Sequence, residues 1–116
     1  MEKLFVYGLL KPGYYEPKTA KSAVAAKIHA DLFDLDGKDA GVKNVGKTSA
    51  IADGYVLTLP QSELDHLDKM EAPEFKRIRT KTLSGEDVWV YEYLKAIPKR
   101  DKEVEDWENL KKVIKK

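Results

Sequence analysis

The order of strand-like and helix-like segments is the strongest constraint on how this chain folds. Short apolar or alternating segments, typical of β-strands, fill most of the chain, and Gly or Pro residues interrupt them. Apolar residues repeat at helical spacing in only two stretches, one after Pro60 and one after Pro98. Many strands with short connections and few helices favour an α+β fold, in which a mixed or antiparallel sheet curls toward a small β-barrel flanked by helices.

Five segments are predicted to be strands. Leu4–Tyr7 is apolar on both faces, which is typical of a buried strand, and it stops at Gly8. Residues 37–47 hold three glycines and predict a loop. Gly54, inside a strand, indicates a bulge or a close approach of another backbone. The other expected strands are Ile28–Leu35, Ala50–Leu59, Phe75–Leu83 and Val88–Leu94, the last two joined by a hairpin turn over Ser84–Asp87.

Three helices are expected. Alanine has a high helix propensity, so the Ala-rich segment Thr19–Ala26 predicts a short one. The second begins near Ser62 as N-cap, turns Leu64, Leu67 and Met70 toward the core, and ends before Pro73. The third is capped by Asp101 and covers an edge of the barrel. We expect one domain over residues 1–116, with a barrel core (1–97) and a C-terminal helical extension (98–116), whose apolar stripe is Val104, Trp107, Leu110 and Ile114.

Composition excludes several classes of site. The chain has 116 residues, a net charge of +1 and no cysteine, so disulfides and cysteine-based catalysis are excluded, and no concentrated basic face suggests nucleic acid. His29 and His66 lack a second ligand at convincing spacing, so we expect both at the surface and no metal site. No apolar stretch is typical of a signal peptide or a membrane span, which predicts a cytoplasmic protein without membrane partners, as a monomer or homodimer.

Two features predict a functional site. The strand that ends at Tyr7-Gly8 leaves backbone N–H groups without sheet partners, and such groups can bind a carboxylate or an oxyanion; an ordinary turn is the alternative. Glu71 sits at a helix C-terminus beside apolar residues, which raises a carboxyl pKa toward the range of a general acid/base. The alternative is a solvated glutamate paired with Arg77 or Lys69, and Glu74 is an equally near acid.

An ordered set of motifs resembles the gamma-glutamylcyclotransferase-like, or AIG2-like, family. The opening segment Val6-Tyr7-Gly8-Leu9-Leu10, followed by Gly13, resembles the family's first strand and turn. Further matching motifs follow in the same order as in the family, as far as about Leu94. It is carried by Ala30–Leu35, by Ile51-Ala52-Asp53-Gly54-Tyr55, by Leu67-Asp68-Lys69-Met70-Glu71, by Phe75-Lys76-Arg77 and by Trp89-Val90-Tyr91.

The resemblance implies a fold and a reaction. A small barrel with flanking helices would hold a cavity between the first turn and the helix end. An enzyme of this family would cyclise a gamma-glutamyl amine or peptide to 5-oxoproline and release the amine, without a cofactor. Glu71 would act as general acid/base, and the substrate-binding residues would be Tyr7, Gly8, Leu9, Leu10, Phe75 and Tyr91.

Two positions differ from the family pattern. Leu9 stands where the family usually has Ser or Thr, and Phe75 stands where it usually has Tyr, so each removes a hydroxyl from the implied site. A non-catalytic domain that binds a small ligand on the same scaffold therefore remains an alternative. A structural module that self-associates through the Trp107 helix is a third hypothesis.

Overall fold

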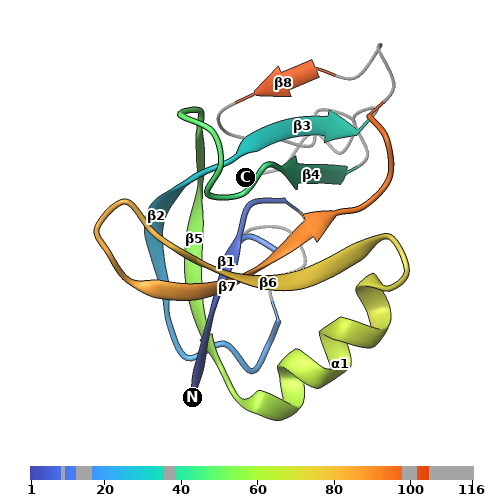
Figure 1. Cartoon of the computed structure of the whole chain (residues 1–116). Helices are drawn as coiled ribbons and strands as arrows, with labels where there is room; N and C mark the ends of the chain where they lie inside the picture. The colour runs from blue at the N-terminus through green and yellow to red at the C-terminus, as the bar shows by residue number, and fades with distance from the viewer. Residues whose placement is uncertain (9, 13–16, 36–38, 98–101, 105–116) are drawn as a thin grey trace, which may run out of the picture.

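The computed structural model describes residues 1–8, 10–12, 17–35, 39–97 and 102–104 (Figure 1). Its secondary structure is one helix, α1 (Gln61–Glu71), and strands that form two sheets. The α+β class predicted from the sequence is confirmed. The strands are β1 (Glu2–Val6), β2 (Ala23–His29), β3 (Asp31–Leu35), β4 (Asp39–Lys43), β5 (Ile51–Leu59), β6 (Phe75–Lys81), β7 (Asp87–Tyr93) and β8 (Lys102–Val104).

The larger sheet has five strands in the order β2-β5-β1-β7-β6. β1 lies at its centre, antiparallel to β5 and parallel to β7. The two edge strands curl toward each other until Ile28 of β2 and Thr82, just after β6, form an isolated bridge. The described strands approach a barrel without closing one.

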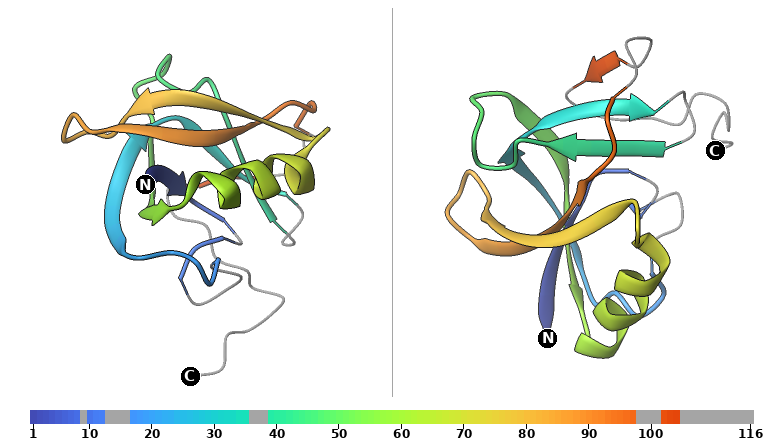
Figure 2. Two further views of the ribbon diagram at one scale, coloured as in Figure 1. Left: turned by 90° about the horizontal axis from the view of Figure 1, so that it is seen from below. Right: turned by 45° about the vertical axis from the view of Figure 1, so that its right-hand side comes forward.

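The smaller sheet has the order β4-β3-β8 and packs across one end of the larger sheet (Figures 1 and 2). Helix α1 lies beside the larger sheet, away from the small one (Figure 1). Alternate residues of β1 therefore enter two apolar cores: Phe5 faces the core shared with β4, whereas Leu4 and Val6 face the core under α1. The end of β1 lies where these two cores meet.

Glycine is required at two close approaches, one between neighbouring strands of the larger sheet and one between the two sheets. A Cβ on Gly54 of β5 would lie 2.2 Å from the carbonyl oxygen of Val6, so the close approach expected at this strand-interior glycine is confirmed. A Cβ on Gly41 of β4 would lie 2.9 Å from the ring of Tyr93 on β7. Gly41 thus allows the small sheet to pack against the large one.

Three secondary-structure expectations are wrong. Ala23–Ala26 belongs to β2 rather than to a helix, because these residues pair with β5 along its length. Part of the expected loop 37–47 is β4, which pairs with β3. Lys102–Val104 is a strand paired with β3 rather than the start of a helix. The rest of the expected C-terminal helix, including Trp107, lies outside the described residues.

Helix α1 also differs in detail from its prediction. It begins at Gln61 with Pro60 as N-cap, so Ser62 lies inside the helix and makes no cap. Leu64 and Leu67 are buried as expected, but Met70 is 62% exposed. The expected surface positions of His29 and His66 are confirmed.

Candidate functional site

A cavity of about 190 Å³ opens at the junction of the two cores. It lies between the end of β1, the start of β4 and the last turn of α1, three elements that are far apart in the sequence. Most of its walls are apolar, and two carboxylates interrupt them. The lining residues are Phe5, Val6, Tyr7, Gly8, Leu10, Asp39, Ala40, Met70, Glu71, Phe75 and Tyr91.

Glu71 reaches this cavity because of its position in the helical repeat. Residues at i, i+3, i+4 and i+7 share one face of a helix. Counted from the buried Leu64, this face continues through Leu67 and Asp68 to Glu71. Met70 falls one residue short of the repeat, which explains its exposure. The face that packs on the sheet thus ends in a carboxylate rather than in an apolar side chain.

The surroundings of Glu71 disfavour its negative charge. Burial, and after it the neighbouring carboxylates of Asp39 and Glu74, together raise the pKa of its carboxyl from 4.5 to about 7. The predicted direction of this shift is confirmed, and burial is its first cause. Asp39 contributes from β4, an element expected to be a loop. A carboxyl group with a pKa near 7 can both accept and donate a proton at neutral pH.

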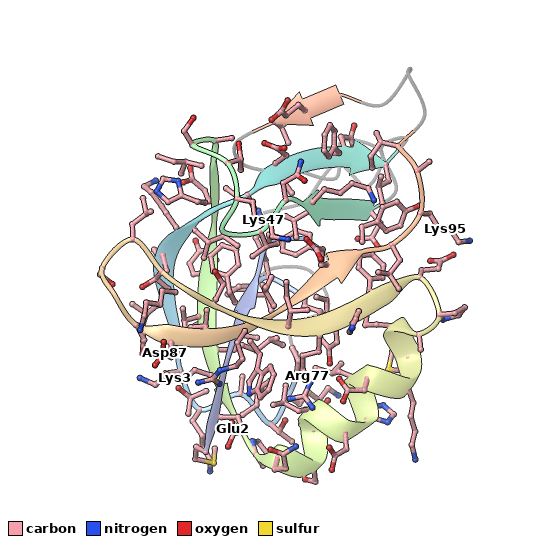
Figure 3. All side chains as sticks on the ribbon, in the orientation of Figure 1. Glu2, Lys3, Lys47, Arg77, Asp87 and Lys95 are labelled. Atoms are coloured by element: carbon pink, nitrogen blue, oxygen red, sulfur yellow. The ribbon has the colours of Figure 1, made fainter. Side chains whose placement is uncertain are left out.

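Arg77, one of the two alternative partners for Glu71, and Glu74, the competing acid, are both engaged elsewhere. Arg77 on β6 contacts Asp68, with its Nε 2.9 Å from Oδ1, and it lies between β6 and α1 (Figure 3). Glu74 is exposed and pairs with Lys95 at 3.2 Å. Of the three acids Asp68, Glu71 and Glu74 at this end of the helix, Glu71 is the one that lines the cavity.

The turn after β1 forms the opposite side of the cavity. The Lys11 N–H donates to the Gly8 carbonyl at 3.0 Å, which closes a tight turn and uses the Lys11 amide within it. Gly8 is buried, and a Cβ there would lie 3.1 Å from the Cβ of Ala40. The turn and the start of β4 thus pack closely, and both face Glu71 across the cavity.

The hydroxyl groups of Tyr7 and Tyr91 form hydrogen bonds between the elements that line the cavity. The Tyr7 hydroxyl donates to the Tyr91 carbonyl at 2.7 Å and also hydrogen-bonds to the backbone of Val42 on β4. The Tyr91 hydroxyl donates to Asp68 on α1 at 2.7 Å. Burial raises the pKa of both phenols, so both are neutral donors at neutral pH.

The structure brings most of the predicted site residues together. Glu71, Tyr7, Gly8, Leu10, Phe75 and Tyr91 all line the one cavity, and Leu9 lies outside the described residues. Sequence reasoning missed Asp39 and Ala40, because residues 37–47 were expected to form a loop. The alternation of small or apolar residues at positions 40 and 42 was the only signal of a strand there.

The described part of the chain offers neither a cluster of metal ligands nor a helix that could span a membrane. No group of three or more His, Cys, Asp or Glu side chains within it is placed to hold a metal ion. No helix within it is long and apolar enough to cross a membrane.

Fold and cavity together define a small α+β domain with one acid of raised pKa facing a strand-end turn. A family model described as "Gamma-glutamyl cyclotransferase, AIG2-like" matches residues 4–109, and the chain belongs to this family. The family predicted from the sequence motifs is confirmed. A comparison with curated proteins gave no match.

Solved structures share the fold at low sequence identity. Uncharacterized protein PH0828 from Pyrococcus horikoshii is 16% identical with a TM-score of 0.73, over 90% of this chain and 86% of that one. The uropathogenic E. coli-specific protein c4763 is 17% identical with a TM-score of 0.71, over 90% and 87%. A gamma-glutamyl cyclotransferase is 17% identical with a TM-score of 0.52, over 88% and 69%.

Proposed function

We propose that this protein cyclises a gamma-glutamyl amine or peptide to 5-oxoproline and releases the amine, with Glu71 as general acid/base. The observation that carries the proposal is the position of Glu71. A partly buried carboxyl with a pKa of about 7 faces the Gly8 turn across a cavity in a member of the gamma-glutamyl cyclotransferase family. A non-catalytic small-ligand domain on the same scaffold is the alternative, and it would bind gamma-glutamyl compounds without releasing 5-oxoproline.

The proposed reaction moves one proton and exchanges one amide bond for another. The α-amino group reacts in its neutral –NH2 form: as its nitrogen attacks the γ-carbonyl carbon of the same molecule, Glu71 accepts one of its N–H protons. The bond from that carbon to the leaving nitrogen then breaks, and Glu71 returns the proton to the leaving nitrogen. Atoms and charges balance without an oxidant, reductant or cofactor.

The rest of the cavity serves to position the substrate. Both reacting groups belong to one molecule, so holding them close supplies much of the acceleration. Backbone N–H groups of the Gly8 and Leu10 turn would bind the α-carboxylate region, with Tyr7 behind them. Phe75 and Tyr91 would contact the chain of the glutamyl group. Because this wall is apolar, water is excluded and Glu71 keeps its raised pKa.

A panel assay tests this function. The purified protein is incubated with several gamma-glutamyl amines and dipeptides, and 5-oxoproline is measured. Turnover by the wild type that falls at least a hundredfold, on the order of general acid/base catalysis, in Glu71→Gln supports the proposal. Glu74→Gln is the matched control, since it removes a neighbouring acid outside the cavity lining, and it should retain turnover.

Two outcomes contradict the assignment. Equal turnover by wild type and Glu71→Gln would remove Glu71 from the mechanism. Saturable binding of gamma-glutamyl compounds without any 5-oxoproline would instead establish the small-ligand binding domain. Sedimentation at several concentrations would determine whether the protein is a monomer or a homodimer, and imaging in the source cell would test the cytoplasmic location.

A further inference from the structure

Asp68 joins the C-terminal part of α1 to two strands of the larger sheet. The Arg77 guanidinium on β6 pairs with its carboxylate at two points, Nε to Oδ1 at 2.9 Å and Nη2 to Oδ2 at 3.0 Å. The Tyr91 hydroxyl on β7 donates to the same Oδ1 at 2.7 Å. A bidentate pair fixes direction as well as distance. One side chain of the helix is thus held by two strands at once.

The guanidinium of Arg77 is itself held in place by the sheet. Its Cζ lies 4.3 Å from the centroid of the Trp89 ring, and the Trp89 indole N–H donates to Glu2 on β1 at 3.1 Å. The remaining nitrogen of Arg77, Nη1, is buried and has no hydrogen-bond partner in the described part of the chain. The hydrogen bonds of this guanidinium therefore go to Asp68, which gives the helix a rigid anchor on β6.

The contacts of Asp68 reach both sides of the cavity. Glu71 follows Asp68 by three residues, so both side chains lie on the same face of α1. On the other side, the Tyr91 carbonyl accepts from the Tyr7 hydroxyl at 2.7 Å, and Tyr7 directly precedes the Gly8 turn. Asp68 itself is partly exposed and is not one of the described residues that line the cavity.

We propose that Asp68 is a positioning residue for Glu71. Through Arg77 and Tyr91 it holds the last turn of α1 at a set distance from the turn at the end of β1. It acts on the place of the Glu71 carboxyl and leaves contact with the substrate to the residues of the lining. This inference rests on the proposed function. A shift of about 1 Å in a reacting group can cost on the order of a hundredfold in rate, so an anchor beside the general acid/base bears on kcat.

The pKa of Glu71 gives a second measure of its position. Burial is the first cause that raises this pKa to about 7, and the charges of Asp39 on β4 and of Glu74 follow. The two tyrosines of the cavity wall also face Glu71, and burial raises the pKa of both phenols, so they stay neutral. Because burial leads, a fall of this pKa after a change at Asp68 would report that Glu71 has moved toward solvent.

Asp68→Asn tests the inference, because it keeps the shape of the side chain and removes the charge that pairs with Arg77. We measure kcat and KM for 5-oxoproline release. The titration of Glu71 is followed by carbon NMR of the protein labelled at its glutamate carboxyl groups, with Glu71→Gln to identify the signal. We expect kcat to fall about tenfold, KM to change by less than about threefold, and the midpoint of Glu71 to fall by about one pH unit.

Asp65→Asn is the matched control. It removes the same charge from the same helix, at an exposed position where Asp65 accepts from Gln61 of α1 at 3.0 Å. It should leave kcat and the midpoint of Glu71 unchanged. Arg77→Lys provides a second variant if Asp68→Asn does not fold. Lysine keeps the positive charge but cannot make the bidentate contact, so kcat and the midpoint should fall in the same direction.

The outcomes separate positioning from simple stabilisation of the fold. If Asp68 only stabilises the fold, Asp68→Asn lowers the urea midpoint, while the folded protein keeps the wild-type kcat or the wild-type titration of Glu71. Either result overturns the inference. A loss confined to KM also overturns it, because it would place Asp68 at the substrate.

The same experiment distinguishes this inference from the proposed function. If the wild type releases no 5-oxoproline from any gamma-glutamyl compound, the proposed function fails. The titration of Glu71 then decides the role of Asp68 without turnover: a lower midpoint in Asp68→Asn supports positioning, and an unchanged midpoint contradicts it.

Discussion

Replacing Glu71 with Gln is expected to stabilise the folded protein at pH 8 and to change its stability little at pH 4.5. Glutamine keeps the shape of the side chain but carries no charge. In the folded protein, burial and then Asp39 and Glu74 raise the pKa of Glu71 to about 7, whereas the unfolded chain has the ordinary value of 4.5. The folded state therefore binds this proton more tightly, so stability is lost as the pH rises from 4.5 through about 7.

The size of this effect follows from the two pKa values. A change from 4.5 to about 7 corresponds to about 3.5 kcal/mol, since one pKa unit is about 1.4 kcal/mol. Glu71 is only partly buried, and solvent screens part of its interaction with Asp39 and Glu74. We therefore expect the ionised carboxylate to destabilise the fold by about 1.5 kcal/mol above pH 7. Tyr7 and Tyr91, which also face it, stay neutral throughout this range.

Urea unfolding at pH 4.5, 6 and 8 measures the difference between Glu71→Gln and the wild type. The stabilisation should grow with pH and level off above about 7. A difference that is the same at all three pH values would show that Glu71 titrates as an ordinary exposed glutamate, which would refute the reasoning. Glu74→Gln is the control: this exposed residue pairs with Lys95, and its loss should change the free energy of unfolding by about 0.5 kcal/mol or less.

Three shorter predictions follow from the same geometry. Tyr7→Phe removes a buried donor to the Tyr91 carbonyl and should lower the free energy of unfolding by about 1–2 kcal/mol; an unchanged urea midpoint would contradict this. Gly54→Ala should cost about 3 kcal/mol or prevent folding, because its Cβ would lie 2.2 Å from the Val6 carbonyl; wild-type thermal stability would show that β1 and β5 can separate. If Glu71 is the base, kcat/KM of the proposed cyclisation should fall about tenfold per pH unit below pH 7; a flat profile from pH 5 to 7 would exclude it.

The secondary structure was predictable where one local signal was strong. β1 and β7 have apolar runs bounded by turn residues, and Pro73 marks the end of α1. The first part of β2 was missed because alanine favours a helix locally, whereas the pairing of Ala23–Ala26 with β5 decides the structure. Such pairing joins residues about thirty positions apart, and no local propensity reports it.

The site was predictable only in part, because some of its residues carry a local sequence signal and others do not. Glu71 and the Gly8 turn each carry a local signal, a helix end and a strand end. Asp39 carries none, because its place beside Gly8 depends on β4 pairing with β3 and packing across β7. Its electrostatic effect on Glu71 therefore emerges only from the assembled fold.

The conflict between Glu71 and its position in α1 strengthens its assignment. The inward face through Leu64 and Leu67 calls for an apolar residue at position 71, yet the chain has a carboxylate there that destabilises the fold when ionised. Asp68 shares this face, but Arg77 and Tyr91 compensate its charge with direct contacts. Departures from a local folding rule that lack such compensation are expected where function requires them. On this reasoning we propose that Glu71, rather than Asp68, is the acid that acts on a ligand in the cavity.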